Sequence, residues 1–428
     1  MRQNVVVSCP IDTYSGYGAR SRDFVQALIN LDKYDIEILA QKWGNCRAGY
    51  LSDHDEDLME SMIIGQVASK PDIWFQITVP NEFQPVGHYN IGVTAGIETT
   101  LCHATWIQGL NRMDLNLVSS KHSAKVFREA NYEKVDERTK KVHEKIALLK
   151  PLEVLLEGGN LDKYFPKKVT KGSVVDELDS IKESFNFLVC GHWMQGNLGH
   201  DRKNIGYTIK SFLETFKNSR KNTPGLILKI QEVGSSIMDR NSILKKIEAI
   251  RSQVKGKLPN IYLLHGEMAD SEVNDLYNHQ KVKAMVSHTR GEGFGRPLLE
   301  FSLIGKPIIA SGWSGQVDFL DKKLTILIGG ELKKLDKSSV QKDILIPESS
   351  WFMPNDAQTN HAYKQIIKHY KEWVIRAKKL KFRNRTDFCF DKMQEILEGY
   401  LKEYVKEPPK ELELKLPILE IPKLTKNE

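Results

Sequence analysis

The 428-residue sequence lacks any apolar run of the roughly 18 residues that a membrane-spanning helix needs. Its N-terminal segment also lacks the basic and then apolar pattern of a secretory signal. Cysteine is scarce: the five cysteines are odd in number, scattered and without a CxxC pair. That pattern fits neither a disulfide framework nor a zinc site, and it favours buried or free thiols in a reducing compartment. We therefore expect a cytoplasmic protein.

The chain also carries only a small excess of positive charge. The chain has 62 Lys and Arg against 55 Asp and Glu, a net charge of +7 that is unevenly spread. The run from Arg376 to Arg385 is strongly basic, and a second charged segment, Lys134 to Lys150, precedes an expected strand at Leu152. Both could attract anionic lipids or nucleic acid, while a solvated helix face is the plainer interpretation. Peripheral contact of the basic run with an anionic membrane surface stays open.

Signals for metal chemistry are weak. The string Asp53-His54-Asp55-Glu56-Asp57 contains the D-x-D pattern that metal-dependent transferases use, but no clear strand precedes it. We expect a surface acidic loop there and no metal site. Apolar residues make up 40% of the chain and charged residues 27%, as in soluble globular proteins. The length exceeds one comfortable core and predicts two domains.

Two glutamates, Glu292 and Glu300, flank a glycine-rich turn in the most informative segment of the chain. Val282 to Ser287 is typical of a buried strand, and Pro297 to Ile304 of a helix with proline in its first turn. Even at helical rise the two backbones would lie about 12 Å apart. Carboxylates so placed could hold hydroxyls at opposite ends of an extended molecule. The loop amides and the helix N-terminus suit phosphate, so the pattern predicts a nucleotide-sugar site.

The string E-G-F-G-R-P-L-L-E from Glu292 to Glu300, followed by G-K-P-I-I-A-S, resembles the E-x7-E motif of family 4 of the retaining glycosyltransferases. That family shares the GT-B fold. The resemblance implies that Glu292 binds the donor sugar and that Glu300 binds the ribose. It also implies that backbone amides between them face the sugar and the diphosphate, namely those of Gly293, Phe294, Gly295 and Arg296. An ordinary strand–turn–helix is the plainer alternative.

The N-terminal segment is similar to the same family. Met1 to Ser8 is expected to form a strand, followed by a turn that contains Gly16 and Gly18 and by a helix from Ala19 to Leu31. The resemblance implies that the two glycines face the donor phosphate and sugar across the cleft. Glycines also serve plain turns, and that alternative stays open.

A second strand–loop–helix series begins at Phe185 to Gly191, and its helix ends near Phe216. Its loop resembles the family's R-K-G/N segment, which implies that Lys203 neutralises the diphosphate. Many members carry an arginine just after the strand, where this chain has His192. Either His192 or Arg202 could therefore meet the second phosphate charge.

Glu98 lies in the polar loop after an expected strand near Ile91, at a position where relatives often keep a histidine or an acid close to the reacting carbon. A carboxylate there could orient the acceptor hydroxyl or take its proton. A buried structural glutamate is an equal alternative. Leu155 to Pro166 resembles the segment that closes the family's first domain, so matching pieces span about residues 1 to 330.

Alternating strand and helix signals predict an α/β chain with two Rossmann-like doubly wound domains facing each other across a cleft, as in GT-B proteins. We place the acceptor-side domain at 1–168 and the nucleotide-sugar domain at 169–385. Residues 386–428 would form a helix from Asp391 to Lys406 that crosses back to the first domain, followed by an extended or disordered tail.

The sequence as a whole predicts a retaining glycosyltransferase that moves a hexosyl unit from a UDP- or GDP-linked sugar to a glycan, a lipid-linked glycan or another acceptor. Catalysis would rest on positioning and on stabilising the departing diphosphate. The family resemblance implies that no metal or other cofactor takes part. The predicted catalytic residues are Glu292, Lys203 and Glu98. Two alternatives remain: a transferase that acts on hydroxymethylated pyrimidines in DNA, and a catalytically silent GT-B binding module.

Overall fold

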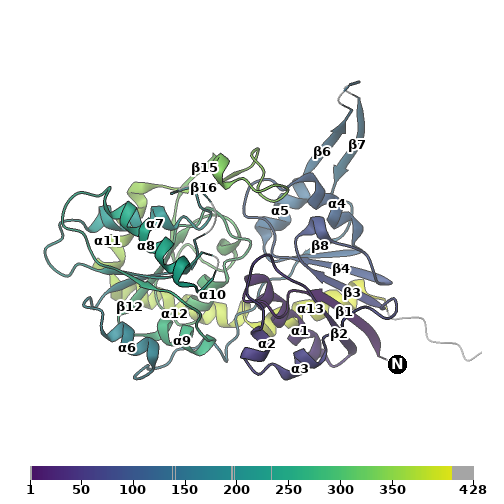
Figure 1. Cartoon of the computed structure of the whole chain (residues 1–428), viewed down its shortest axis with the longest axis horizontal. Helices are drawn as coiled ribbons and strands as arrows, with labels where there is room; N and C mark the ends of the chain where they lie inside the picture. The colour runs from purple at the N-terminus through teal and green to yellow at the C-terminus, as the bar shows by residue number, and fades with distance from the viewer. Residues whose placement is uncertain are drawn as a thin grey trace, which may run out of the picture.

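The computed structural model describes residues 2–406 apart from 137, 140, 194, 195, 197 and 233. Figure 1 shows two α/β lobes side by side, and a helical segment at the end of the chain runs from one lobe to the other. The expected tail from 407 onward lies outside the described residues. The prediction of two doubly wound domains is confirmed.

The first domain is built on a six-stranded parallel sheet of order β2-β1-β3-β4-β5-β8. Its strands are β1 (Gln3–Cys9), β2 (Tyr34–Ala40), β3 (Ile73–Ile77), β4 (Tyr89–Thr94), β5 (Leu115–Val118) and β8 (Leu152–Val154). Around them lie α1 (Gly16–Leu31), α2 (Tyr50–Asp53), α3 (Asp57–Ser61), the 3-10 turn η1 (Pro80–Glu82), α4 (Ala104–Arg112) and α5 (Lys121–Glu129). The strands are rich in valine, isoleucine and aromatic residues because helices cover both faces of a parallel sheet.

The second domain also has six parallel strands, in the order β11-β10-β9-β12-β13-β14. They are β9 (Asn186–His192), β10 (Gly225–Gln231), β11 (Ile261–Leu264), β12 (Val282–Ser287), β13 (Ile308–Ser311) and β14 (Ile326–Ile328). Its helices are α6 (Ser173–Asp179), α7 (Ile205–Phe216), α8 (Ile237–Arg251), α9 (Asp270–Asn278), α10 (Arg296–Ser302), α11 (Asp356–Lys368) and α12 (Tyr370–Asp387). A small antiparallel pair, β15 (Gly330–Lys334) and β16 (Ser350–Pro354), completes it.

Each sheet has a point where its strand order reverses direction. In the first domain it lies between β1 and β3, and in the second between β9 and β12. Ligands of open parallel sheets bind beyond the carboxyl ends of the strands at such points. The loops after β1, β9 and β12 carry most of the predicted site residues, so the topology places them at the ligand-binding edges of the two sheets.

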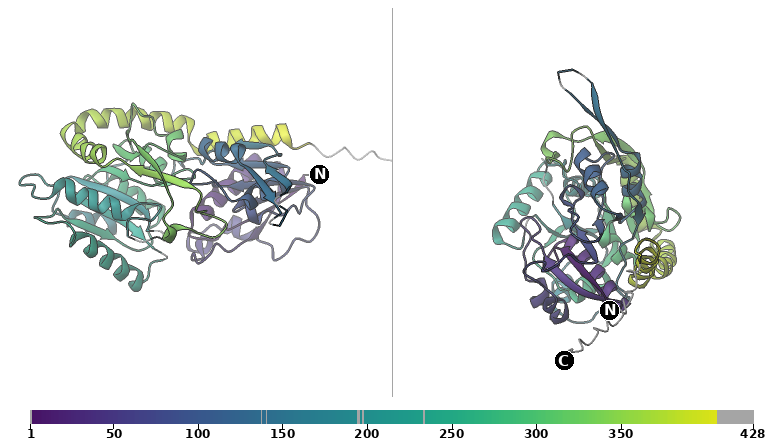
Figure 2. Two further views of the ribbon diagram at one scale, coloured as in Figure 1. Left: turned by 90° about the horizontal axis from the view of Figure 1, so that it is seen from above. Right: turned by 90° about the vertical axis from the view of Figure 1, so that its right-hand side faces the viewer.

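The last helix, α13 (Phe390–Tyr404), returns to the first domain. Its Met393, Leu397 and Leu401 are buried in the same apolar core as residues of β1 and α1. Arg20 of α1 is also buried and donates hydrogen bonds to the carbonyls of Leu155 and Leu156 in the linker between the domains. Figure 2 shows α12 and α13 running along one side of the molecule across both lobes.

The charged segment before β8 forms a hairpin of β6 (Asn131–Val135) and β7 (Val142–Ala147), which projects from the first domain (Figure 1). The basic run lies in α12, where one face is buried and Lys378 and Lys379 are exposed. Within the described part of the chain, no helix is both long enough and apolar enough to cross a membrane. All five cysteines are unpaired.

The acidic string at 53–57 differs from the expected loop. Asp53 ends α2 and Asp57 begins α3, so the string links two short helices. The carboxylate of Asp53 accepts a hydrogen bond from Tyr14 at 2.7 Å and pairs with Arg47. These local partners explain why an acidic residue is present here without invoking a metal.

Candidate active site at the domain interface

Glu292 lies in the loop between β12 and α10, where neighbouring backbone holds it in place. Its N–H donates to Ser314 Oγ at 2.9 Å, and its carbonyl accepts from the Gly315 N–H at 3.0 Å. Gly295 has a φ of +103° at the start of α10, a backbone conformation that residues with a side chain rarely adopt. Glycine at 295 therefore allows the chain to turn from the loop directly into the helix.

The Glu292 carboxylate is the centre of a buried charge cluster. Lys203 Nζ lies 2.7 Å from Oε1 and 2.8 Å from Oε2 of Glu292, and Nη1 of Arg202 lies 3.1 Å from Oε2. The same Arg202 nitrogen lies 3.5 Å from Glu98 of the first domain. Four residues that the sequence singled out thus meet at one place, two cations between two carboxylates.

The charges of this cluster stabilise one another. Burial alone would raise the pKa of Glu292, but the adjacent Lys203 and Arg202 outweigh it and lower that pKa to about 2. For Lys203, burial is the largest influence and lowers its pKa, with Glu292 acting in the opposite direction. Burial also lowers the pKa of His192, assisted by Lys203. His192 is therefore neutral near pH 7, and Arg202 is the charged member of that pair of candidates.

The two domains touch directly beside the cluster. A β-carbon added to Gly291 would lie 1.8 Å from the carbonyl oxygen of Glu98. One added to Gly293 would lie 2.2 Å from the carbonyl oxygen of Ala95. Side chains at either glycine would push the domains apart, so these glycines permit a close approach of the loop after β12 to the loop after β4.

Four consecutive backbone N–H groups follow Glu292 without a hydrogen-bond acceptor in the described part of the chain, those of Gly293, Phe294, Gly295 and Arg296. Backbone donors left free in a row suit an anionic ligand. The Phe294 side chain itself is buried against Phe319, with ring centroids 5.0 Å apart. Phe294 therefore offers its backbone to a ligand and its ring to the core.

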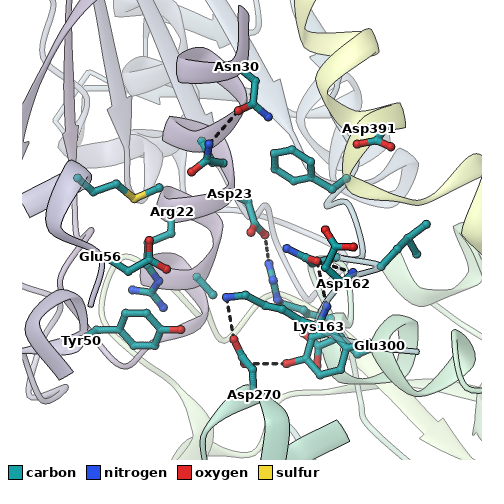
Figure 3. Close-up of a pocket in the computed structure, with 18 residues that line it drawn as sticks. Arg22, Asp23, Asn30, Tyr50, Glu56, Asp162, Lys163, Asp270, Glu300 and Asp391 are labelled. Carbon is teal, nitrogen blue, oxygen red and sulfur yellow. Dashed lines mark hydrogen bonds and ion pairs between the residues drawn. The ribbon is translucent and has the colours of Figure 1, made fainter. Parts of the chain in front are cut away.

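Glu300 faces a separate pocket of about 700 Å³ that both domains line (Figure 3). Its carboxylate pairs with Arg296 at 2.9 Å, and Arg296 also pairs with Asp23 of α1 at 2.5 Å. Burial raises the pKa of Glu300 to about 7, with Arg296 opposing the shift. The structure thus does not bring Glu300 into the Glu292 cluster. It places Glu300 beside a cavity large enough for a small organic ligand.

Gly16 and Gly18 belong to the first turn of α1, so this helix begins three residues before the predicted start at Ala19. The reason is the side chain of Ser15, which accepts a hydrogen bond from the Gly18 N–H and caps the helix. A β-carbon on Gly18 would lie 2.2 Å from the carbonyl of Thr13, while one on Gly16 would meet nothing within 4 Å. The loop's own packing explains glycine at 18, and space for a ligand remains at 16.

Sequence reasoning missed several residues of the Glu300 pocket. Lys163 pairs with Asp270 at 2.8 Å, and Tyr164 donates to the same carboxylate at 2.9 Å. Figure 3 shows Arg22 and Tyr50 of the first domain on the opposite wall. The one local signal was the position of Asp270 just beyond the carboxyl end of β11. The others reach the pocket only because α1, α2 and the linker fold against the second domain.

No protein-family model and no curated protein sequence matches the chain. Solved structures do match it. Sucrose-phosphate synthase from Thermosynechococcus elongatus gives a TM-score of 0.59 at 10% identity, over 94% of this chain and 99% of that chain. HepE from Anabaena in complex with UDP and glucose gives 0.57 at 12% identity, over 94% and 100%. WaaG, a glycosyltransferase involved in lipopolysaccharide biosynthesis, gives 0.54 at 13% identity, over 92% and 100%.

These likenesses show the fold. The chain has the GT-B architecture of two facing α/β domains that the sequence motif implied. Its assignment to family 4, the roles of Glu292 and Glu300, and the domain boundaries at 168 and 385 stay predictions.

Proposed function

We propose that this protein is a retaining glycosyltransferase that transfers a hexosyl unit from a UDP- or GDP-linked sugar to an acceptor hydroxyl. The observation that carries the proposal is the buried cluster of Glu292, Lys203 and Arg202 next to four free backbone N–H groups. Cations and amide donors together suit a diphosphate, and a carboxylate beside them suits sugar hydroxyls. The GT-B neighbours support the same reading, since HepE was solved with UDP-glucose.

In the proposed reaction the donor diphosphate takes over Lys203 and Arg202 as ion-pair partners. Glu292 is then free to accept hydrogen bonds from the donor sugar, and Glu300 accepts them from the ribose. Lys203 and the loop amides stabilise the charge that develops on the departing diphosphate, which is the task a metal ion performs in other transferases. Glu98 orients the acceptor hydroxyl from the first domain. The acceptor attacks from the face that the diphosphate leaves, with a donor phosphate oxygen receiving its proton.

The test is a thermal-shift screen of UDP- and GDP-linked hexoses, followed by donor hydrolysis with the purified protein. A bound donor should raise the melting temperature in proportion to RT ln(1 + [L]/Kd), and slow hydrolysis should follow without added metal. Donor binding without hydrolysis or transfer would favour the silent binding module. Transfer only to DNA that contains hydroxymethylated pyrimidines, with a steep salt dependence, would favour the DNA-modifying alternative.

We also propose that α12 contacts an anionic bilayer surface. Ile375 and Phe382, two helical turns apart, are 59% and 77% exposed, and Lys371, Lys378 and Lys379 lie exposed around them. Apolar side chains flanked by lysines on one helix face are typical of interfacial helices. Sedimentation with phosphatidylserine vesicles should exceed that with phosphatidylcholine vesicles, and the Phe382→Ala variant should lose the excess. Equal sedimentation with both would contradict the proposal.

A further inference from the structure

A second, smaller cavity of about 240 Å³ lies in the first domain. It is formed at the carboxyl ends of three adjacent strands: β1 contributes Ser8, β2 leads into Trp43, and β3 contributes Trp74 and Gln76. Alternate residues of a strand point to one face of a sheet, so Trp74, Gln76 and Thr78 share a wall. This sheet edge carries the ligand site in doubly wound domains, and none of the predicted site residues occupies the cavity.

The lining of this cavity combines aromatic surface with neutral hydrogen-bonding groups. Trp43 is half-buried, and Trp74 is 3% exposed with an indole N–H that donates to no group in the described part of the chain. Gln76, Thr78 and Gln84 add amides and a hydroxyl. The only charged lining residues, Lys42 and Glu82, cancel each other. A ring with an apolar C–H face, several hydroxyls and no charge fits such a lining.

The polar groups are held in place before any ligand arrives. Gln76 donates to the carbonyl of Glu82 at 3.1 Å and accepts from the Gln84 N–H at 2.7 Å. Thr78 donates to one carboxylate oxygen of Glu82 at 2.5 Å. The Gln84 side chain makes no hydrogen bond to the described residues. A ligand would therefore meet fixed groups together with one free side-chain amide, and would spend little free energy on ordering them.

A continuous chain of contacts joins the cavity to the Glu292 cluster. The ring of Trp43 stacks on Tyr17, with centroids 4.0 Å apart at 25°. The Tyr17 hydroxyl lies 3.0 Å from Thr94 Oγ1 and accepts from the Ala95 N–H at 3.1 Å. Ala95 is the residue whose carbonyl faces Gly293, next to Glu292. Trp43 in the cavity wall is thus joined to the loop of Glu292 through Tyr17 and Ala95, both in the first domain.

We propose that this cavity binds an uncharged sugar ring of the acceptor, which makes the acceptor a carbohydrate. The inference rests on the proposed function for its connection to transfer, but the sugar site itself rests on the Trp43 and Trp74 cavity. Its size is below the roughly 300–1,000 Å³ of pockets for drug-sized ligands, which suits one ring of a longer glycan. The absence of net charge in the lining disfavours a nucleotide, whose phosphates would need cations.

The experiment measures binding of methyl glycosides of glucose, galactose, mannose and N-acetylglucosamine to the full chain by saturation-transfer NMR, with a single-stranded oligonucleotide as contrast. At least one glycoside should bind saturably without any donor. Trp43→Ala should weaken that binding about tenfold or more through loss of the aromatic face. Gln84→Ala should weaken it severalfold, and because this exposed side chain is free of hydrogen bonds, the variant should fold normally.

The matched control is Met238→Ala, which removes an exposed apolar side chain from α8 of the second domain and should leave glycoside binding unchanged. Absence of saturable binding by all four glycosides overturns the inference, as does an equal loss in the Met238→Ala variant. Binding of the oligonucleotide that depends on Trp43 overturns it in favour of a nucleic-acid base. Because glycoside binding is measured without donor, its outcome is independent of the thermal-shift test of the proposed function.

Discussion

At the scale of single residues, the ion pairs of Glu292 change what its substitution is expected to do. From sequence, Glu292→Gln would leave the fold intact and reduce turnover. In the structure this change leaves Lys203 buried without its partner, so we expect a loss of about 3–5 kcal/mol in unfolding free energy. Turnover should also fall by roughly two or more powers of ten, because the contact strengthens in the transition state.

A double variant separates these two effects. Adding Lys203→Met to Glu292→Gln removes the unpaired cation, while Arg202 keeps Glu98 as a partner. We expect unfolding by denaturant to show recovered stability and transfer assays to show no recovered turnover. Recovery of both would mean that Glu292 and Lys203 serve the fold alone.

The raised pKa of Glu300 predicts a pH dependence of donor binding. Glu300 binds ribose hydroxyls best as a carboxylate, so lowering the pH through its pKa of about 7 should weaken binding of a nucleotide sugar. The loss should approach about tenfold per pH unit below 7. Calorimetry with a nucleotide sugar is the suitable measurement, because its diphosphate carries no second proton near pH 6. The Glu300→Gln variant should bind more weakly at pH 8 and should lose this pH dependence.

The titration of Glu300 affects stability and donor binding in opposite directions: rising pH favours donor binding and lowers the stability of the ligand-free protein. Because the folded pKa of Glu300 lies above its ordinary value of 4.5, the folded protein holds the proton more tightly. The Glu300 carboxyl therefore lowers the unfolding free energy of the ligand-free protein as pH rises from about 4.5 to about 7. Glu300→Gln should raise the melting temperature more at pH 8 than at pH 5. An equal change at both pH values would contradict the assigned pKa.

At the scale of elements, the turn into α10 depends on the backbone of Gly295. Alanine there would need a φ of +103°, and its β-carbon would lie 3.2 Å from that of Gln316. We expect Gly295→Ala to cost about 1–3 kcal/mol in unfolding free energy and to weaken donor binding, since the free amides belong to this turn.

Gly399 offers the matched control for that change. It lies within α13, and a β-carbon there would meet nothing within 4 Å. Gly399→Ala should therefore stabilise the protein by about 0.5–1 kcal/mol. If chemical denaturation showed similar effects for the two alanines, strain at 295 would not be what defines the turn.

At the scale of the whole molecule, Asp23 and Arg296 join the two domains across the Glu300 pocket. Asp23→Asn removes a charged hydrogen bond of a kind worth about 1.5–3 kcal/mol and should favour a more open cleft. We expect an increased radius of gyration by small-angle scattering and about ten- to a hundredfold weaker donor binding. Asp32→Asn is the control, because its pair with Arg2 is exposed and worth little. Unchanged scattering and affinity in Asp23→Asn would show that other contacts hold the domains together.

The sequence by itself determined the elements around the site. The strand at 282–287 and the helix from 205 to 216 follow from local patterns of apolar residues. The strand has the predicted bounds, and the helix ends at the predicted residue. The loops after them carry Lys203 and Glu292, and the motif marked those residues directly. In a parallel fold the carboxyl ends of strands gather at one edge, so a residue just after a strand can be placed from sequence alone.

Only the tertiary structure decided which residues meet. The pairing of Arg296 with Asp23, the pocket wall of Arg22 and Tyr50, and the stacking of Trp43 on Tyr17 join segments that carry no shared local pattern. The structure also placed Glu300 in a pocket shared with Arg22 and Tyr50, apart from the ion pairs of Glu292. Periodicity reports which face of an element is buried, whereas these contacts depend on how two domains dock, and docking is set by side chains far apart in the chain.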